Sequence, residues 1–275
     1  MDIREDSFQG LVQVQDCGHM GYRQAYTLQE SLLAKVLSAR EDASHESDAS
    51  VQKAHKKTGE TGQTVVGRVL LLEHEPVITI SGRKGAADHL LASQTMLKRA
   101  GVALEQTNRG GDITYHGPGQ LVVYPILDLN LLMLRLHDYM RLLEQVVIET
   151  IAEFGIVGLR DPGATGVWVE RDGRLAKIAA MGVRVRRWIS MHGLALNVTT
   201  NLEHFKLIVP CGLAGRPVTS LSELLGEECP GMDCVKEILM SKLRYHLTQA
   251  RSRAIAHRCA AECEFSEGKT QGSQP

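Results

Sequence analysis

The segment 109–120, Arg-Gly-Gly-Asp-Ile-Thr-Tyr-His-Gly-Pro-Gly-Gln, constrains this chain more than any other part of its sequence. Four glycines and one proline in twelve residues cannot continue a regular helix, but they let the backbone turn tightly and approach a ligand closely. The polar residues between them supply hydrogen-bonding groups and one fixed positive charge. No Gly-Lys-Ser/Thr sequence closes the segment, so it is not a phosphate-binding P-loop. Composition alone fits a glycine-rich hairpin equally well.

The apolar residues of the chain follow two different periods. Runs typical of strands lie at 11–15, 65–72, 77–80, 121–124, 166–169 and 177–186. Apolar spacings of three and four, typical of helices, lie at 21–39, 138–154 and 234–250. Strands and helices interleave without a strict βαβα order. This arrangement predicts an α/β fold with a mixed sheet, in the α+β sense.

Two segments differ in composition from the rest. Residues 41–63 are rich in Ser, Asp, Glu, Lys, Gly and Thr, and such a segment buries too little apolar surface to offset its ordering entropy. We therefore expect a polar insertion there, as a disordered loop or a mobile helix end. Residues 226–275 form an expected C-terminal extension that contains a helix, and its end beyond Glu262 is expected to fray.

Charge and hydropathy exclude several classes of partner. The 31 basic and 32 acidic residues give a net charge of −1, so no global field gathers nucleic acid or anionic lipid. The most apolar stretch, 121–136, is interrupted by Pro125, Asp128, Asn130 and Arg135 and falls short of the ~18 apolar residues of a membrane helix. The charged start lacks an apolar signal region, and the six cysteines are irregularly spaced, as expected of free thiols in a reducing compartment. We expect a soluble, cytoplasmic protein.

Metal binding is not expected either. Cys229 and Cys234 are five residues apart, and Cys259 and Cys263 are four apart near His257. These spacings do not provide the two compact ligand pairs of a structural zinc site.

Two further residues could carry chemistry. Lys177 heads the apolar run 177–183, where burial of its stem would partly desolvate the ammonium and lower its pKa. A lysine that snorkels to solvent at the start of a strand explains the same pattern. Cys211 stands between proline and glycine, in a turn that can present a thiol outward. A lone cysteine is, however, more often a small core residue than a nucleophile.

Taken in order, four motifs resemble the lipoate-protein ligase B family, whose members are octanoyl-[acyl-carrier-protein]:protein N-octanoyltransferases. They are Arg-Gly-Gly-x-x-Thr-Tyr-His-Gly-Pro-Gly-Gln, Lys-Ile-Ala-x-x-Gly-x-Arg, His-Gly-Leu-Ala-Leu-Asn-Val and Pro-Cys-Gly. The resemblance covers residues 11–225 and implies one catalytic domain with the fold of the biotin and lipoate protein ligases. It carries no expectation for 41–63 or for 226–275.

The resemblance implies the first step of endogenous protein lipoylation. The donor would be octanoyl-acyl carrier protein, and the acceptor a specific lysine of lipoyl-domain proteins such as glycine cleavage H protein and 2-oxoacid dehydrogenase E2 subunits. It implies an acyl-thioester intermediate on Cys211 with Lys177 beside it, and neither a metal nor another cofactor. By the same matching, the residues that line the octanoyl chain would be Arg109, Gly110, Gly111, Asp112, Ile113, Thr114, Tyr115, His116, Ala180, Met181, Gly182, Gly193, Leu194 and Ala195. Ala180 stands where many family members have serine.

The reaction needs help with two protons. A free thiol with pKa ~8.5 is only about 3% ionised at pH 7, and an amine with pKa ~10.4 is only about 0.04% unprotonated. Lys177 could stabilise the thiolate as a cation, or accept the protons as a neutral amine. We expect Lys177 to be the shared base, with His192 as the alternative.

Two other functions fit parts of the sequence. An ATP-dependent lipoate or biotin ligase shares the fold, but it activates its acid as an adenylate and needs no nucleophilic cysteine. A catalytically silent module that docks acyl carrier or lipoyl domains would have no use for both Lys177 and Cys211. The Pro-Cys-Gly turn therefore favours the octanoyltransferase.

Overall fold

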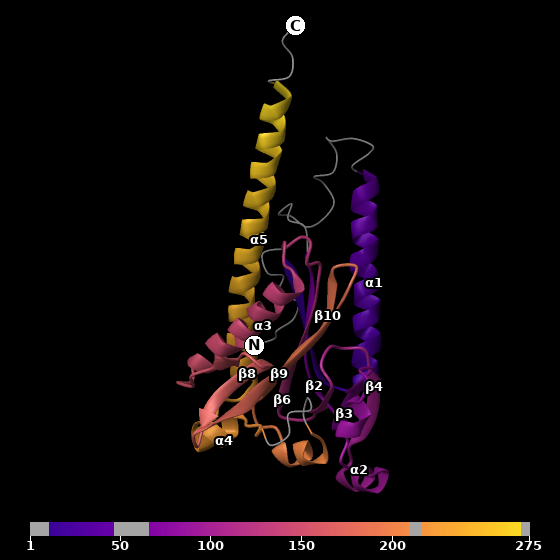
Figure 1. The fold of residues 1–275 in the computed structure, drawn as a ribbon, viewed down its shortest axis with the longest axis vertical. Coiled ribbons are helices and arrows are strands. Elements are labelled where there is room, and N and C mark those ends of the chain that lie inside the picture. Colours follow the sequence, from indigo (N-terminus) through magenta and orange to yellow (C-terminus); the bar gives the residue numbers. More distant parts are fainter. Residues whose placement is uncertain (1–10, 47–65, 210–215, 271–275) are drawn as a thin grey trace.

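The computed structural model describes residues 11–46, 66–209 and 216–270 of the 275-residue chain. A long helix covers one face of a large sheet, two helices cover the other face, and a small second sheet stands beside them (Figure 1). The predicted α/β class with a mixed sheet is confirmed. No described helix is long and apolar enough to span a membrane.

Seven described strands form the main sheet in the order β1-β2-β6-β10-β9-β8-β7. β1 pairs parallel with β2, and the later neighbours pair antiparallel. The edge strand β1 alternates between buried and exposed residues over its first half, whereas the central strand β10 is buried throughout. The bounds are β1 (Val12–Met20), β2 (Gly67–His74), β6 (Gln120–Leu127), β7 (Leu159–Asp161), β8 (Ala164–Arg171), β9 (Arg174–Arg186) and β10 (Ile189–Asn197).

The small sheet has the strand order β4-β3-β5, with bounds β3 (Val77–Ser81), β4 (Ala103–Thr107) and β5 (Ile113–His116). Between β3 and β4 the chain forms the short 3-10 helix η1 (Ala86–His89) and the helix α2 (Gln94–Ala100). Ser93 caps the start of α2 by accepting a hydrogen bond from the Met96 N–H. The small sheet has its own apolar cluster, which includes Ile78, Ile113 and Tyr115.

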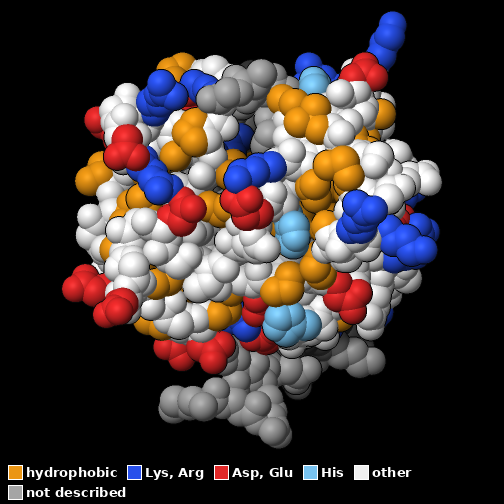
Figure 2. All heavy atoms as spheres, turned by 90° about the horizontal axis from the view of Figure 1, so that it is seen from below, with side chains coloured by type: hydrophobic (Ala, Val, Ile, Leu, Met, Phe, Trp, Pro, Cys, Tyr) orange, Lys and Arg blue, Asp and Glu red, His pale blue; other side chains and the backbone are white. Residues whose placement is uncertain are grey.

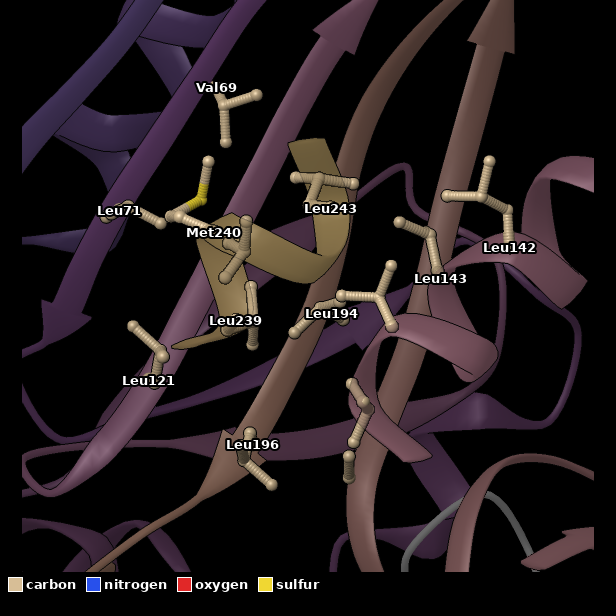
Figure 3. Packing of buried hydrophobic residues seen from close by; sticks show 14 of the residues in the cluster. Val69, Leu71, Leu121, Leu142, Leu143, Leu194, Leu196, Leu239, Met240 and Leu243 are labelled. Carbon is tan, nitrogen blue, oxygen red and sulfur yellow. The ribbon is translucent and has the colours of Figure 1, made fainter. Parts of the chain in front are cut away.

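The two faces of the main sheet are covered differently. Helix α1 (Tyr22–Glu46) packs Ala25, Leu32 and Leu33 against one face. Helices α3 (Leu136–Ala152) and α5 (Met232–Thr270) cover the other face. Figure 3 shows this second layer, where Leu239, Met240 and Leu243 of α5 and Leu142 and Leu143 of α3 meet Val69, Leu71, Leu121, Leu194 and Leu196 of the sheet. Between β10 and α5 lie the short helices η2 (Leu202–Leu207), α4 (Leu221–Leu225) and η4 (Gly226–Glu228).

Helices extend into both segments of unusual composition, 41–63 and 226–275. Helix α1 extends into the expected insertion as far as Glu46, and the remainder of that segment, 47–63, lies outside the described residues. Helix α5 continues to Thr270, past Glu262, where the sequence predicts a flexible tail. The reason is local, because alanine, glutamate and lysine in this stretch favour a helix.

The end of the molecule that carries α4 and the small sheet is shown in Figure 2. Lysine and arginine side chains are interspersed there with aspartate and glutamate, and hydrophobic side chains lie among them. This mixed surface agrees with the near-zero net charge of the sequence.

His74 is a polar residue in the core between α1 and the main sheet. Its Nδ1 lies 2.9 Å from the Met20 carbonyl oxygen, which can only accept, so Nδ1 carries the proton and donates. Nε2 then accepts from the Tyr124 hydroxyl at 2.8 Å. Burial lowers the pKa of His74 to about 4, because the core disfavours the charged imidazolium. The fold therefore contains His74 as a neutral ring.

The packing of α5 predicts that its inner face is essential to stability. We expect Leu239→Ala to lower the free energy of unfolding by about 3 kcal/mol, because removing a fully buried leucine side chain leaves a cavity. Ile255→Ala, on the same helix but 48% exposed, should change it by less than about 0.5 kcal/mol. Urea denaturation followed by circular dichroism measures both. Equal effects of the two substitutions would contradict the role of α5 in the core.

The lowered pKa of His74 predicts that the stability of the fold decreases at acidic pH. Its folded-state pKa of about 4 lies below the ~6.5 of an unfolded histidine, so the unfolded chain binds a proton that the fold does not accept. The free energy of unfolding should therefore fall as the pH drops from about 6.5 to about 4, by up to about 1.4 kcal/mol per pH unit from this group. His74→Gln should flatten this dependence, whereas His137→Gln, at a side chain that is 75% exposed, should not. Denaturant titrations over this range test it, and identical slopes for the wild type and His74→Gln would refute it.

Candidate active site

An open cavity lies between the main sheet, the small sheet and the start of α1. It encloses about 450 Å³ of empty space, part of which is open to solvent. Its lining residues are Tyr22 from α1, Arg109 and Gly111 from the glycine-rich segment, Thr114 and His116 from β5, Tyr124 from β6, Ala180, Met181 and Gly182 from β9, and His192, Gly193, Leu194 and Ala195 from β10.

Two glycines bring the glycine-rich segment into direct contact with the main sheet. The Gly110 N–H donates to the Val183 carbonyl at 2.9 Å, and a Cβ on Gly110 would lie 2.9 Å from that same oxygen. From the other side, a Cβ on Gly182 would lie 2.7 Å from the Gly110 carbonyl oxygen. Neither position has room for a side chain, so glycine at both positions allows the segment to lie against β9.

Arg109 ties this contact to the small sheet. Its guanidinium donates to the Thr79 carbonyl at 2.9 Å, to the Gly110 carbonyl at 3.0 Å and to the Asp112 carbonyl at 3.3 Å. The arginine therefore joins β3 to the segment that precedes β5, while it also forms part of the cavity wall.

The structure brings together most of the residues that the sequence assigns to substrate binding. Arg109, Gly111, Thr114, His116, Ala180, Met181, Gly182, Gly193, Leu194 and Ala195 all line the cavity. His192, the alternative base, lines it too.

Four predicted binding residues do not line the cavity. Ile113 and Tyr115 alternate with Thr114 and His116 along β5 and pack into the core of the small sheet. The Tyr115 hydroxyl is hydrogen-bonded to His204 Nδ1 at 2.8 Å, and burial raises the pKa of Tyr115 to about 12. The Asp112 carboxylate lies 2.8 Å from His89 Nδ1, and Gly110 contacts β9.

Tyr22 and Tyr124 line the cavity but were not predicted from the sequence. Each stands in an apolar pattern, Tyr22 on a helix face and Tyr124 in a strand run, and both patterns also describe an ordinary core residue. Their hydroxyls are engaged outside the cavity. Tyr22 donates to Thr107 Oγ1 at 2.6 Å, and Tyr124 donates to His74.

The histidines of the cavity are neutral and have defined tautomers. His116 Nδ1 donates to Gln120 Oε1 at 2.7 Å, because the Gln120 amide nitrogen faces the Tyr115 carbonyl and Asn197 Oδ1. His192 Nε2 donates to Asn108 Oδ1 at 3.0 Å. Each ring therefore keeps a lone pair on its second nitrogen.

Burial is the main cause of their neutrality. It lowers the pKa of His192 to about 3, with further contributions from the positive charges of Arg109 and Arg184. It also holds the pKa of His116 well below the usual range, and the neighbouring His74 adds to this effect. A group this hard to protonate accepts hydrogen bonds but is a weak base.

Lys177 lies in β9 but not in the cavity wall. It is 7% exposed, and its Nζ is 4.7 Å from the centre of the Trp168 ring. Its backbone N–H donates to the Pro217 carbonyl, and its carbonyl accepts from the Thr219 N–H, each at 2.9 Å. The chain 217–219 thus runs parallel to β9 at Lys177.

Cys211 lies outside the described residues. The described residues on either side of 210–215 are well anchored. The Val209 N–H donates to the His89 carbonyl at 2.8 Å, and Arg216 Nη2 donates to Asp161 Oδ2 at 2.5 Å. Within the described part of the chain, no group of three or more histidine, cysteine, aspartate or glutamate side chains is arranged to hold a metal ion.

The chain matches one family model over residues 22–244, that of the lipoyl protein ligase A/B catalytic domain. An octanoyltransferase of Flavobacterium psychrophilum is 42% identical over 239 residues, which are 86% of this chain and 95% of that protein. One from Cytophaga hutchinsonii is 41% identical over 84% of this chain and 91% of its own length. One from Solibacter usitatus is 54% identical over 58% of this chain and 70% of its own length.

Solved structures show the same fold at low sequence identity. The Plasmodium falciparum LipL1 structure in complex with lipoate has a TM-score of 0.59 at 12% identity, over 87% of this chain and 62% of that one. A bipartite lipoate protein ligase from Thermoplasma acidophilum has a TM-score of 0.54 at 16% identity, over 66% and 71%. The expected ligase-like fold is confirmed.

The sequence matches extend over most of both chains, and the fold agrees with them. The chain therefore belongs to the lipoyl protein ligase A/B catalytic-domain family, within its octanoyltransferase branch, the lipoate-protein ligase B enzymes, and is an acyltransferase.

Proposed function

We propose that this enzyme transfers an octanoyl group from octanoyl-acyl carrier protein to a specific lysine of lipoyl domains, through a thioester on Cys211. The observation that carries the proposal is a buried lysine, Lys177, paired through its backbone with residues 217–219, close in sequence to Cys211. Glycine cleavage H protein and 2-oxoacid dehydrogenase E2 subunits are the proposed acceptors. A reducing cytoplasm, the proposed location, keeps the Cys211 thiol free.

The cavity has the character of an acyl-chain site. Ala180 pairs with Ala195, and Gly182 with Gly193, across the adjacent strands β9 and β10. These small residues leave space above the sheet that larger side chains would fill. Each buried methylene of a bound chain contributes about 0.8 kcal/mol, so the depth of the cavity can select chain length.

In the first step, neutral Lys177 takes the Cys211 thiol proton, and the sulfur forms a bond to the acyl carbon of the donor. The bond between that carbon and the carrier's sulfur breaks, and the carrier thiolate takes the proton from Lys177. Splitting the transfer into two thioester reactions lowers the barrier of each.

In the second step, the neutral amine of the acceptor lysine attacks the acyl carbon, and the bond to Cys211 breaks. The surplus proton of the new amide nitrogen passes through Lys177 to the Cys211 thiolate. We assign this shuttle to Lys177 rather than to His192, because a ring with a pKa of about 3 is a poor acceptor for a proton from an amine.

Incubation with octanoyl-acyl carrier protein tests the covalent step. We expect intact-protein mass spectrometry to show an increase of about 126 Da, the mass of one octanoyl group that replaces a proton. Cys211→Ser should remove both the increase and the transfer to a lipoyl domain, because a hydroxyl is a far weaker nucleophile than a partly ionised thiol. Near-native transfer by a folded Cys211→Ser enzyme would contradict the mechanism. ATP–pyrophosphate exchange in the presence of lipoate would instead identify an adenylating ligase.

The substitution Lys177→Arg distinguishes two possible roles of Lys177, a cation that stabilises the Cys211 thiolate and a base that shuttles protons. Arginine keeps the positive charge but cannot act as a base at pH 7, because its pKa is above ~12. We expect Lys177→Arg to preserve part of the ionisation of Cys211, measured by the pH dependence of alkylation, yet to lose most octanoyl transfer. Transfer at close to the wild-type rate would show that Lys177 acts through its charge alone.

A further inference from the structure

We propose that Trp168 is the positioning residue for Lys177, because its indole holds the lysine ammonium and the Arg216 guanidinium together near the start of β9. The inference rests on the proposed role of Lys177 in octanoyl transfer. It adds a residue that none of the four sequence motifs contains.

The ring is itself rigidly placed. Trp168 is 1% exposed, and its Nε1–H donates to the Ala164 carbonyl at 3.1 Å, so the indole cannot rotate without losing this bond. Trp168 stands opposite Lys177 in the β8–β9 register. Tryptophan has the strongest attraction for cations among the aromatic side chains, and the attraction grows when the cation is desolvated, as Lys177 is here.

A bulge in β9 sets the direction of Lys177. Ala179 pairs with Val167 and Lys177 pairs with Trp168, which leaves Ile178 without a partner on β8. An extra residue of this kind reverses the alternation of side chains along the strand. Ala176, Ile178 and Ala179 pack into the cluster under α3 and α5. The extra residue therefore places Lys177 on the opposite face of β9, the face that carries Ala180 and Gly182 at the cavity.

Gly166 makes room for the lysine stem. A Cβ at this position would lie 3.3 Å from Lys177 Cε and 2.6 Å from the Ala179 carbonyl oxygen. The φ of Gly166 is +125°, which disfavours any other residue. The bulge and the glycine together lead the stem of Lys177 across β8 to the indole.

Arg216 is the second cation on the same ring, with its Cζ 4.6 Å from the ring centre. Its guanidinium donates to Asp161 Oδ2, and Asp161 Oδ1 accepts from the Gly163 N–H at 2.7 Å. These two hydrogen bonds, the one from Arg216 first, lower the pKa of Asp161 and keep it charged. Trp168 thus fixes Lys177 relative to the start of the segment 216–219.

This arrangement matters for proton transfer. A lysine has four rotatable side-chain bonds, whereas a proton moves only between groups within about 2.6–3.2 Å of each other. Misplacement by about 1 Å can cost about a hundredfold in rate. An apolar residue could fill the volume of Trp168, but it could not hold the ammonium in one place.

The contact itself can be observed by fluorescence. The chain has two tryptophans, Trp168 and Trp188, and Trp188 is 49% exposed on the turn between β9 and β10. In Trp188→Phe, Trp168 is the only tryptophan left. We expect its emission to change over the pH range in which Lys177 changes its protonation state, and this change to be absent when Lys177→Met is added. The same titration curve in both proteins would overturn the contact.

Kinetics tests the positioning role. We expect Trp168→Leu to lower kcat for octanoyl transfer about tenfold with little change in KM for the octanoyl donor, and Trp168→Phe, which keeps an aromatic face, to lower kcat by about threefold. Trp188→Leu is the matched control and should retain the wild-type kcat.

A folded Trp168→Leu enzyme with the wild-type kcat would overturn the inference, as would equal losses in Trp168→Leu and Trp168→Phe. If Trp168→Leu does not fold, Arg216→Met replaces it. This variant removes the second cation and should lower kcat with KM unchanged, and wild-type kcat there would likewise overturn the inference. A wild-type enzyme that transfers no octanoyl group would refute the proposed function itself, and the fluorescence titration would still decide whether Trp168 holds Lys177.

Discussion

The contact between the glycine-rich segment and strand β9 is the constraint on which the site depends. The main sheet and the small sheet have separate apolar clusters, and the segment 109–111 joins them at the cavity. The Gly110 N–H donates to the Val183 carbonyl, while Gly182 leaves space for the Gly110 carbonyl. A side chain at either position would push the sheets apart and open the cavity wall. The cavity wall therefore depends on the absence of a side chain at Gly110 and at Gly182, which belong to two different motifs.

Desolvation lowers the pKa values of the buried histidines, so they differ in role from Lys177. Within the described part of the chain, no acidic side chain pairs with the buried His74, His116 or His192, and each is held neutral by its surroundings. They present or support hydrogen-bond acceptors at the cavity and do not compete for protons. Lys177 is kept apart from them, on the far side of a strand bulge and against an aromatic ring. The cavity wall thus combines neutral histidines with the charged Arg109, and the amine of Lys177 belongs to a residue paired with the chain 217–219.

Much of the fold and most of the cavity residues could be predicted from the sequence, and each exception has a physical reason. The strand and helix runs follow from hydrophobic periodicity, and the motif residues gather in one cavity because the three segments that carry them are neighbours across two sheets. Ile113 and Tyr115 leave the cavity because alternation along β5 is invisible until the register is known. Periodicity could not separate a snorkelling Lys177 from a buried one, since the answer depends on Trp168, a residue on another strand. The bulge at Ile178 has no signature in the sequence.

Helix α5 has a consequence for the order in which this protein is made. Its residues Leu239, Met240 and Leu243 lie over Leu71, Leu121 and Leu194, which belong to three different strands of the main sheet (Figure 3). A ribosome delivers those strands before α5. Until residues beyond Met232 leave the exit tunnel, one face of the nascent sheet lacks part of its cover and exposes apolar side chains that can bind another chain. The α1 side can be completed early in synthesis, whereas the opposite layer is completed only after α5 has been made, so a chaperone has most apolar surface to protect on that face.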